Sequence, residues 1–112
     1  MTSEQDPDGM GIHEAGAKVD MGKDTFALSM GYFPNALAAI NKVSEFGAEK
    51  YSPFGWMKVK DGRQRYTEAM MRHLLKEFSG ELTDDDSGMQ HDVQSAWNAL
   101  ARLELRLKEE TC

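Results

Sequence analysis

The sequence has one cysteine and no long hydrophobic run, and each of these shortages excludes a class of protein. Cys112 is its only cysteine, which rules out an intrachain disulfide and a cysteine cluster for zinc, and we assign it no role. No stretch approaches the roughly 20 apolar residues of a membrane span, and we see no signal peptide. We therefore expect a cytoplasmic protein without a membrane partner.

Positive charge is also scarce. Lys and Arg number 13 against 19 Asp and Glu, which gives a net charge of −6. A protein that coats nucleic acid needs clustered cations, so we expect no nucleic-acid polymer among the partners. A small phosphate compound is still compatible with this charge if a metal ion or a local cationic patch reverses the field.

The 112 residues suffice for one domain of ordinary globular composition, with 40% hydrophobic and 29% charged residues. Residues 1–17 are polar and lack periodicity, which predicts a flexible N-terminal arm in which His13 and Glu14 are tail residues rather than ligands. Residues 18–112 are predicted to form a single domain, with a short extra turn near residues 25–31.

Apolar residues at helical spacing predict three main helices, over about residues 34–51, 63–79 and 89–109. Pro34 suits a first helical turn, Gly80 suits a C-terminal cap and Ser87 an N-cap. The predicted fold is a small all-α bundle. Its eight methionines favour completion by a homo-oligomer, a dimer or tetramer, although they could instead fill the core of a monomer.

Several glutamates are candidates for a metal site. Glu45 and Glu49 lie four apart on the first helix, and Glu68, Glu77 and Glu81 lie on or just after the second. Carboxylates from facing helices can converge on Mg²⁺, which keeps several waters and needs few protein ligands when phosphates also bind it. A coordinated water could serve as the nucleophile. Taken singly, each glutamate is equally well explained as part of a solvated helix face.

Two other acidic features carry less weight. The run at residues 84–86 is adequately explained by capping and solubility. His91 and Asp92 form an HD pair, the metal-binding dipeptide of a phosphohydrolase class, but that class needs further His and Asp ligands. Only His13 and His73 remain in this chain, so a true HD site is disfavoured.

Cations and aromatic residues are interspersed from ahead of the first long helix to the second. Arg suits forked contacts with phosphate oxygens and Lys supplies a point charge, while aromatic rings can stack on a base. Trp56 could instead plug a loop against the core, and Arg72 could simply pair with Glu68. The residues concerned are Lys18, Lys23, Lys50, Lys58, Lys60, Arg63, Arg65 and Arg72, with Tyr51, Trp56 and Tyr66.

Several short motifs follow one another along the chain: KVDMGK at 18–23, FGAEKY at 46–51 followed by Trp56, RYTEAMMRH at 65–73, GE at 80–81, and SGMQH at 87–91 with Asn98. Through these motifs the chain resembles, over about residues 18–105, a phage family of dATP/dGTP diphosphohydrolase N-terminal domains, grouped with the MazG-like all-α nucleotide pyrophosphohydrolases. The MazG pattern of EExxE followed by ExxD does not occur intact.

This resemblance implies Mg²⁺-dependent cleavage, with Mn²⁺ as an option, between the α and β phosphates of a purine deoxynucleoside triphosphate. It implies catalytic roles for Glu68, His73 and Glu81. With the glutamate pattern, it predicts metal ligands at Glu45, Glu49, Glu68, Glu81 and His91. The expected substrate contacts, which combine the resemblance with the aromatic pattern, are Lys18, Asp20, Lys23, Lys50, Tyr51, Trp56, Arg65 and Arg72.

Three functions remain open from the sequence. The first is an enzyme that trims the purine deoxynucleotide pool during phage infection. The second is a protein that captures a nucleotide without cleaving it, because the acidic motif is incomplete beside intact cationic and aromatic groups. The third is a helical interaction protein, favoured by the methionine content and the acidic surface.

Overall fold

The computed structural model describes residues 7–111, so residues 1–6 of the predicted arm and Cys112 lie outside it. The chain forms two compact units, the first ending at Tyr32 and the second beginning at Phe33. The first unit contains α1 (Ala27–Tyr32), close to the predicted short turn. Within the described residues, no helix is long and apolar enough to cross a membrane.

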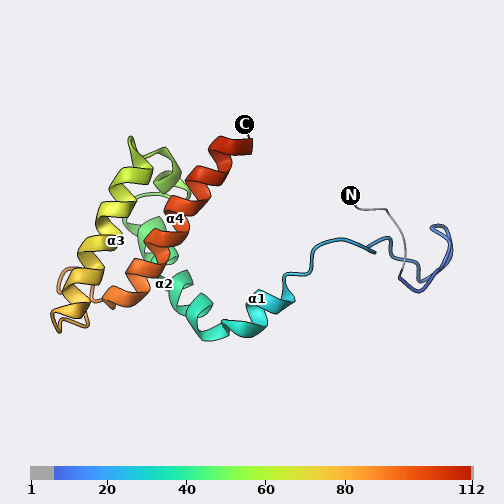
Figure 1. Cartoon of the computed structure of the whole chain (residues 1–112), viewed down its shortest axis with the longest axis horizontal. Helices are drawn as coiled ribbons and strands as arrows, with labels where there is room; N and C mark the ends of the chain where they lie inside the picture. Colours follow the sequence, from blue (N-terminus) through green and yellow to red (C-terminus); the bar gives the residue numbers. More distant parts are fainter. Residues whose placement is uncertain (1–6, 112) are drawn as a thin grey trace. The chain divides into compact units, whose positions relative to one another are not determined.

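The second unit is built from three long helices, as predicted (Figure 1). They are α2 (Pro34–Lys50), α3 (Gly62–Phe78) and α4 (His91–Thr111), with a short 3₁₀ helix, η1 (Gly55–Lys58), between α2 and α3. The described residues contain no β-strand, only an isolated bridge between Thr83 and Gln90. The predicted all-α fold is confirmed.

Local chemistry explains where α2 begins and where α3 ends. Pro34 occupies the first turn of α2, where its missing N–H costs nothing. After α3, Gly80 has a φ of 99° and donates its N–H to Glu77, while the Glu81 N–H donates to Lys76. This pair of hydrogen bonds is a Schellman motif, and it fixes the backbone of Glu81 directly after the helix.

The predicted N-cap at Ser87 is wrong, because α4 begins four residues later, at His91. The Ser87 hydroxyl accepts from the Met89 N–H at 3.2 Å and donates to the Asp84 carboxylate at 3.3 Å. The Asp84 carboxylate also accepts from the Asp86 N–H at 3.1 Å. The acidic run therefore folds into a local turn that leads the chain back to α4.

The buried face of α4 is small and polar. It comprises His91, Ser95, Asn98 and Ala101, which recur at helical spacing, and Ala101 is the only buried hydrophobic residue among those described. Among the described elements, α3 is the main packing partner of α4, and the two helices are neighbours in Figure 1.

Larger apolar side chains remain exposed on both helices. Phe78 is 86% exposed on α3, where Met71 and Leu75 continue the same stripe, and Leu100, Leu103 and Leu107 form a stripe on α4. Scattered apolar residues are normal on a surface, but two stripes beside such a small core are not. They are the surface that the predicted homo-oligomer would cover, and that assembly stays a prediction.

Candidate functional site

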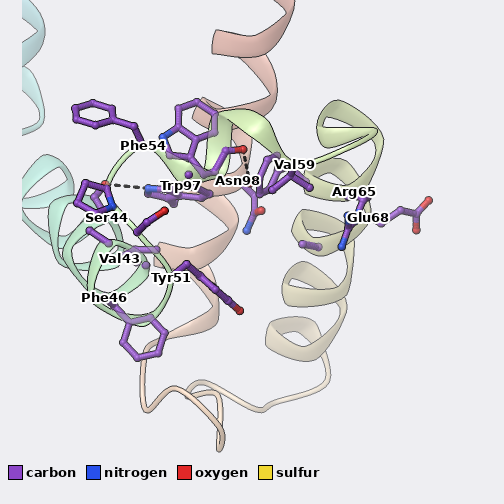
Figure 2. A pocket seen from close by; sticks show the side chains of 18 of the residues that line it. Val43, Ser44, Phe46, Tyr51, Phe54, Val59, Arg65, Glu68, Trp97 and Asn98 are labelled. Atoms are coloured by element: carbon purple, nitrogen blue, oxygen red, sulfur yellow. Dashed lines mark hydrogen bonds between the residues drawn. The ribbon is translucent and has the colours of Figure 1, made fainter.

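A pocket with a cavity volume of about 1170 Å³ opens in the second unit, which is ample for a nucleotide-sized ligand. The C-terminal half of α2, the segment 51–61, α3 and α4 all contribute to it. Figure 2 shows Phe46 and Tyr51 on the α2 side, Arg65 and Glu68 on the α3 side, and Asn98 between them. Its aromatic lining is Phe46, Tyr51, Phe54, Trp56, Tyr66 and Trp97.

Three of these rings hold the pocket wall together. Trp56, Tyr66 and Trp97 pack edge to face with one another, at centroid distances of 6.0, 5.6 and 5.7 Å. The Tyr66 hydroxyl donates to the Trp56 carbonyl at 2.7 Å, and burial raises the pKa of Tyr66, so this donor keeps its proton. The Trp97 indole donates to Ser44 on α2 at 2.9 Å (Figure 2). The cluster therefore joins η1, α3, α4 and α2.

Two residues with left-handed backbone conformation bracket η1. Phe54 has a φ of 61° and Asp61 a φ of 56°, and both line the pocket. A bulky residue in this region costs on the order of 1–3 kcal/mol unless its surroundings impose the conformation. Phe54 is also 77% exposed, so burial does not repay that cost. Strain of this kind gathers at ligand sites, which supports a functional role for this wall.

Charged groups of both signs line the same pocket. Arg65 and Arg72 supply guanidinium groups, and Asp61 and Glu68 supply carboxylates. All four are exposed, which leaves them able to meet a ligand from solvent. The pocket thus combines two guanidinium groups suited to bind phosphate, two carboxylates suited to bind a hard cation, and aromatic side chains.

A second cluster links the end of α3 to the start of α4. The ring of His91 is fully buried, with Nε2 at 2.6 Å from Glu81 Oε2 and Nδ1 at 2.8 Å from His73 Nδ1. An ionised carboxylate only accepts, so His91 Nε2 carries a proton. In the neutral ring Nδ1 then accepts from His73. Glu81 and His73 therefore fix the buried imidazole, and Lys76 lies 3.9 Å from the same carboxylate oxygen.

Protonation of His73 is disfavoured in the folded protein. Burial, followed by the neighbouring His91, holds the pKa of His73 below its usual value of 6.5, although the charge of Asp84 acts the other way. Burial alone would raise the pKa of Asp84, but hydrogen bonds from Asp86 and Ser87 lower it below its usual 3.8. The two shifts have opposite effects: Asp84 is held in its charged form and His73 in its neutral form.

We expect the protein to lose stability as the pH falls from about 7.5 to about 5.5. Below pH 6.5 the unfolded chain takes up a proton at His73 more readily than the native state does. The contribution of His73 to the free energy of unfolding therefore has its full value above that pH and decreases below it. Melting temperatures across this range measure the decline. His73→Asn keeps a donor near the Nδ1 position without titrating, and its curve should be flatter. An equally steep curve would contradict the assignment to His73.

The structure divides the predicted site residues. Tyr51, Trp56, Arg65, Glu68 and Arg72 surround the pocket, whereas His73, Glu81 and His91 form the histidine cluster. Lys50 does not line the pocket, but its ammonium stands 5.8 Å from the Phe46 ring and 5.2 Å from the Tyr51 ring. Lys18, Asp20 and Lys23 belong to the first unit, so their predicted substrate contacts stay predictions.

The predicted metal ligands Glu45, Glu49, Glu68, Glu81 and His91 do not come together as one group within the described residues, and their role in binding a metal stays a prediction. The part of the chain that the structure describes contains no group of three or more His, Cys, Asp or Glu side chains that could hold a metal ion. Glu45 accepts from Asn41 on the surface of α2, and both nitrogens of His91 are already bonded. The two carboxylates of the pocket would suit a Mg²⁺ ion that is also bound by phosphates.

The sequence analysis did not predict several of the residues that line the pocket. Phe54, Asp61 and Trp97 line the pocket but were not among the predicted site residues. Asn98 entered only through the family resemblance. One signal was present, since asparagine is a poor helix former and Asn98 stands in the middle of a strongly helical segment.

The structure is that of an all-α protein with a pocket lined by aromatic rings, arginines and carboxylates. Residues 13–112 match the family described as dATP/dGTP diphosphohydrolase, N-terminal. The chain belongs to this family, as its resemblance had indicated. No curated protein and no solved structure matches it.

Proposed function

We propose that the protein hydrolyses dATP or dGTP to the monophosphate and pyrophosphate, and that it serves nucleotide-pool control in the cytoplasm of a phage-infected bacterial cell. The observation that carries the proposal is the pocket itself, where aromatic rings, two arginines and two carboxylates meet in one cavity. The family description names the same substrates and a diphosphohydrolase activity.

The residues of the pocket suit the parts of a purine triphosphate. The exposed rings of Tyr51 and Phe54 offer surfaces on which a base can stack. The guanidinium groups of Arg65 and Arg72 grip phosphate oxygens through paired N–H donors. In the reaction water attacks the α-phosphorus, the bond between that phosphorus and the bridging oxygen to the β-phosphate breaks, and pyrophosphate leaves.

Mg²⁺ enters this proposal with the substrate. A triphosphate supplies several of its oxygen ligands, so one or two protein carboxylates suffice, and Glu68 and Asp61 are those that line the pocket. Bound Mg²⁺ would neutralise phosphate charge and lower the pKa of a bound water. Glu68 is the residue we assign to orienting that water, and Arg65 and Arg72 hold the phosphates in place. Mn²⁺ has compatible chemistry and could substitute.

Product analysis tests the proposal. The protein is incubated with each of the four dNTPs and Mg²⁺, and the products are separated by anion-exchange chromatography. We expect dATP or dGTP to yield its monophosphate and pyrophosphate in equal amounts, and EDTA to stop the reaction. Release of orthophosphate and a diphosphate, or no turnover at high protein concentration, would contradict the proposal.

A second candidate is nucleotide capture without hydrolysis. It is favoured by the incomplete acidic motif of the sequence beside the arginines and aromatic rings that line the pocket. Calorimetry in EDTA separates the two functions. Tight binding without metal, with the nucleotide recovered intact after later incubation with Mg²⁺, favours capture.

Self-association belongs to the same proposal. A second copy of the chain could pack on the two exposed apolar stripes. These are Met71, Leu75 and Phe78 on α3, and Leu100, Leu103 and Leu107 on α4. Sedimentation velocity decides the point. A dimer or tetramer supports the assembly, and a monomer throughout a wide concentration range contradicts it.

A further inference from the structure

Asn98 is a nearly buried polar side chain that opens on the pocket. Only 7% of the residue is exposed, and it lies on the face of α4 that packs closely in the unit. Its Nδ2 donates to the Gln94 carbonyl one turn earlier, at 2.8 Å. A carbonyl only accepts, so this hydrogen bond fixes which end of the amide is nitrogen and which is oxygen.

The amide oxygen of Asn98 remains available. No described residue donates to Oδ1, yet the described side chains include no fully buried nitrogen or oxygen without a partner. Oδ1 is therefore reachable by solvent, and the pocket is the opening that Asn98 lines. Figure 2 shows the amide pointing into the space between Tyr51 and Arg65. One acceptor and the second hydrogen of Nδ2 are thus presented to a ligand.

Helical packing alone does not call for an asparagine here. Thr67, Ser79 and Ser95 each satisfy the carbonyl four residues earlier with a hydroxyl, at 2.7 to 2.9 Å. Serine would do the same at position 98 with less bulk, and asparagine is a weaker helix former than alanine. Unlike serine, asparagine also presents the acceptor Oδ1 and a second Nδ2–H donor side by side.

We infer that the Asn98 amide reads the base of the bound purine nucleotide, an inference that rests on the proposed function. Oδ1 accepts the N6–H of adenine or the N1–H of guanine, and the free Nδ2–H donates to the adjacent ring nitrogen or to O6. An asparagine amide pairs with adenine in this bidentate way at protein–nucleic acid contacts. The base contact leaves the phosphates to Arg65, whose Nη1 also donates to the Lys60 carbonyl at 3.4 Å, and to Arg72.

A double-mutant cycle between protein and nucleotide tests this role. Wild type and Asn98→Ser are titrated by calorimetry, with Ca²⁺ in place of Mg²⁺, with dATP and with the purine deoxyriboside triphosphate that lacks the 6-amino group. Serine at 98 can bond the Gln94 carbonyl as Ser95 bonds that of His91, so the helix keeps its contact. Circular dichroism verifies the fold.

Wild type should bind dATP about tenfold more tightly than the analogue, the value of one well-made hydrogen bond, and Asn98→Ser should bind the two equally. Gln94→Ser is the matched control: it removes an amide of the same helix that donates to Met89 and does not line the pocket, and the tenfold preference should survive. If the preference persists in Asn98→Ser, or is absent from wild type, the inference is overturned.

Asn98→Asp gives an independent arm should the serine variant fold poorly. A carboxylate only accepts, so it suits the neighbouring N1–H and N2–H of guanine and opposes the ring nitrogen beside the adenine amino group. The ratio of dGTP to dATP affinity should rise about tenfold. An unchanged ratio overturns the inference alone, because wild type still binds and cleaves purine nucleotides. Failure of wild type to bind either one overturns the proposed function as well.

Discussion

Glu68→Gln should lower the rate of dGTP hydrolysis about 100-fold or more, while nucleotide affinity changes only a few-fold. Glutamine has nearly the same shape as glutamate but carries no charge. A carboxylate that orients the attacking water, or shares Mg²⁺ with the phosphates, loses that function without disturbing the pocket wall. Steady-state rates and calorimetric affinities measure the two quantities separately.

Two further variants locate the reactive carboxylate. Glu110→Gln changes a surface glutamate that pairs with Arg106 within α4, and its rate should equal that of wild type. Glu81→Gln retains an oxygen that accepts from His91, so it should fold normally and lose less activity than Glu68→Gln. If Glu81→Gln abolishes turnover and Glu68→Gln does not, the catalytic carboxylate belongs to the histidine cluster and our assignment fails.

Trp97→Ala should lower the free energy of unfolding by about 2–3 kcal/mol, somewhat less than removal of a fully buried aromatic side chain costs, because Trp97 is half-buried and lines the pocket. Trp97 contacts both other rings of the aromatic cluster and bonds to α2 through Ser44. Domains have roughly 5–15 kcal/mol in total, so this one change would remove a large share of that stability. Urea denaturation followed by circular dichroism, at one fixed protein concentration, measures the loss.

Ser44→Ala isolates the hydrogen bond from the packing. It removes only the acceptor of the Trp97 indole, on a partly exposed contact, and should cost about 0.5–1.5 kcal/mol. If Trp97→Ala costs no more than Ser44→Ala, the three rings do not stabilise the unit, and the pocket wall must be held by other contacts.

Local sequence signals predicted the helices because local chemistry sets their limits. Pro34 stands in the first turn of α2, and Gly80 ends α3 through its left-handed backbone. The same logic explains why Arg65, Glu68 and Arg72 came together. They lie three and four residues apart on one helix, so a correct helix places them on one face and hence along one pocket.

Tertiary contacts were beyond that logic. The bond between His91 and Glu81 depends on the Schellman motif and the turn that follows, which bring the two residues together. The sequence suggested His91 as a metal ligand because it does not show that both ring nitrogens form hydrogen bonds within the fold. The left-handed conformation of Phe54 carries no local signal either, because residues of its kind rarely adopt it.

The location of the nucleotide is the central claim, and the two indole N–H signals in an NMR spectrum test it most directly. The chain has two tryptophans, Trp56 and Trp97, and both line the pocket. On titration with a dGTP analogue that resists cleavage between the α and β phosphates, both signals should shift and saturate together. If calorimetry shows the analogue bound while neither signal moves, the nucleotide binds elsewhere and the pocket is not the site.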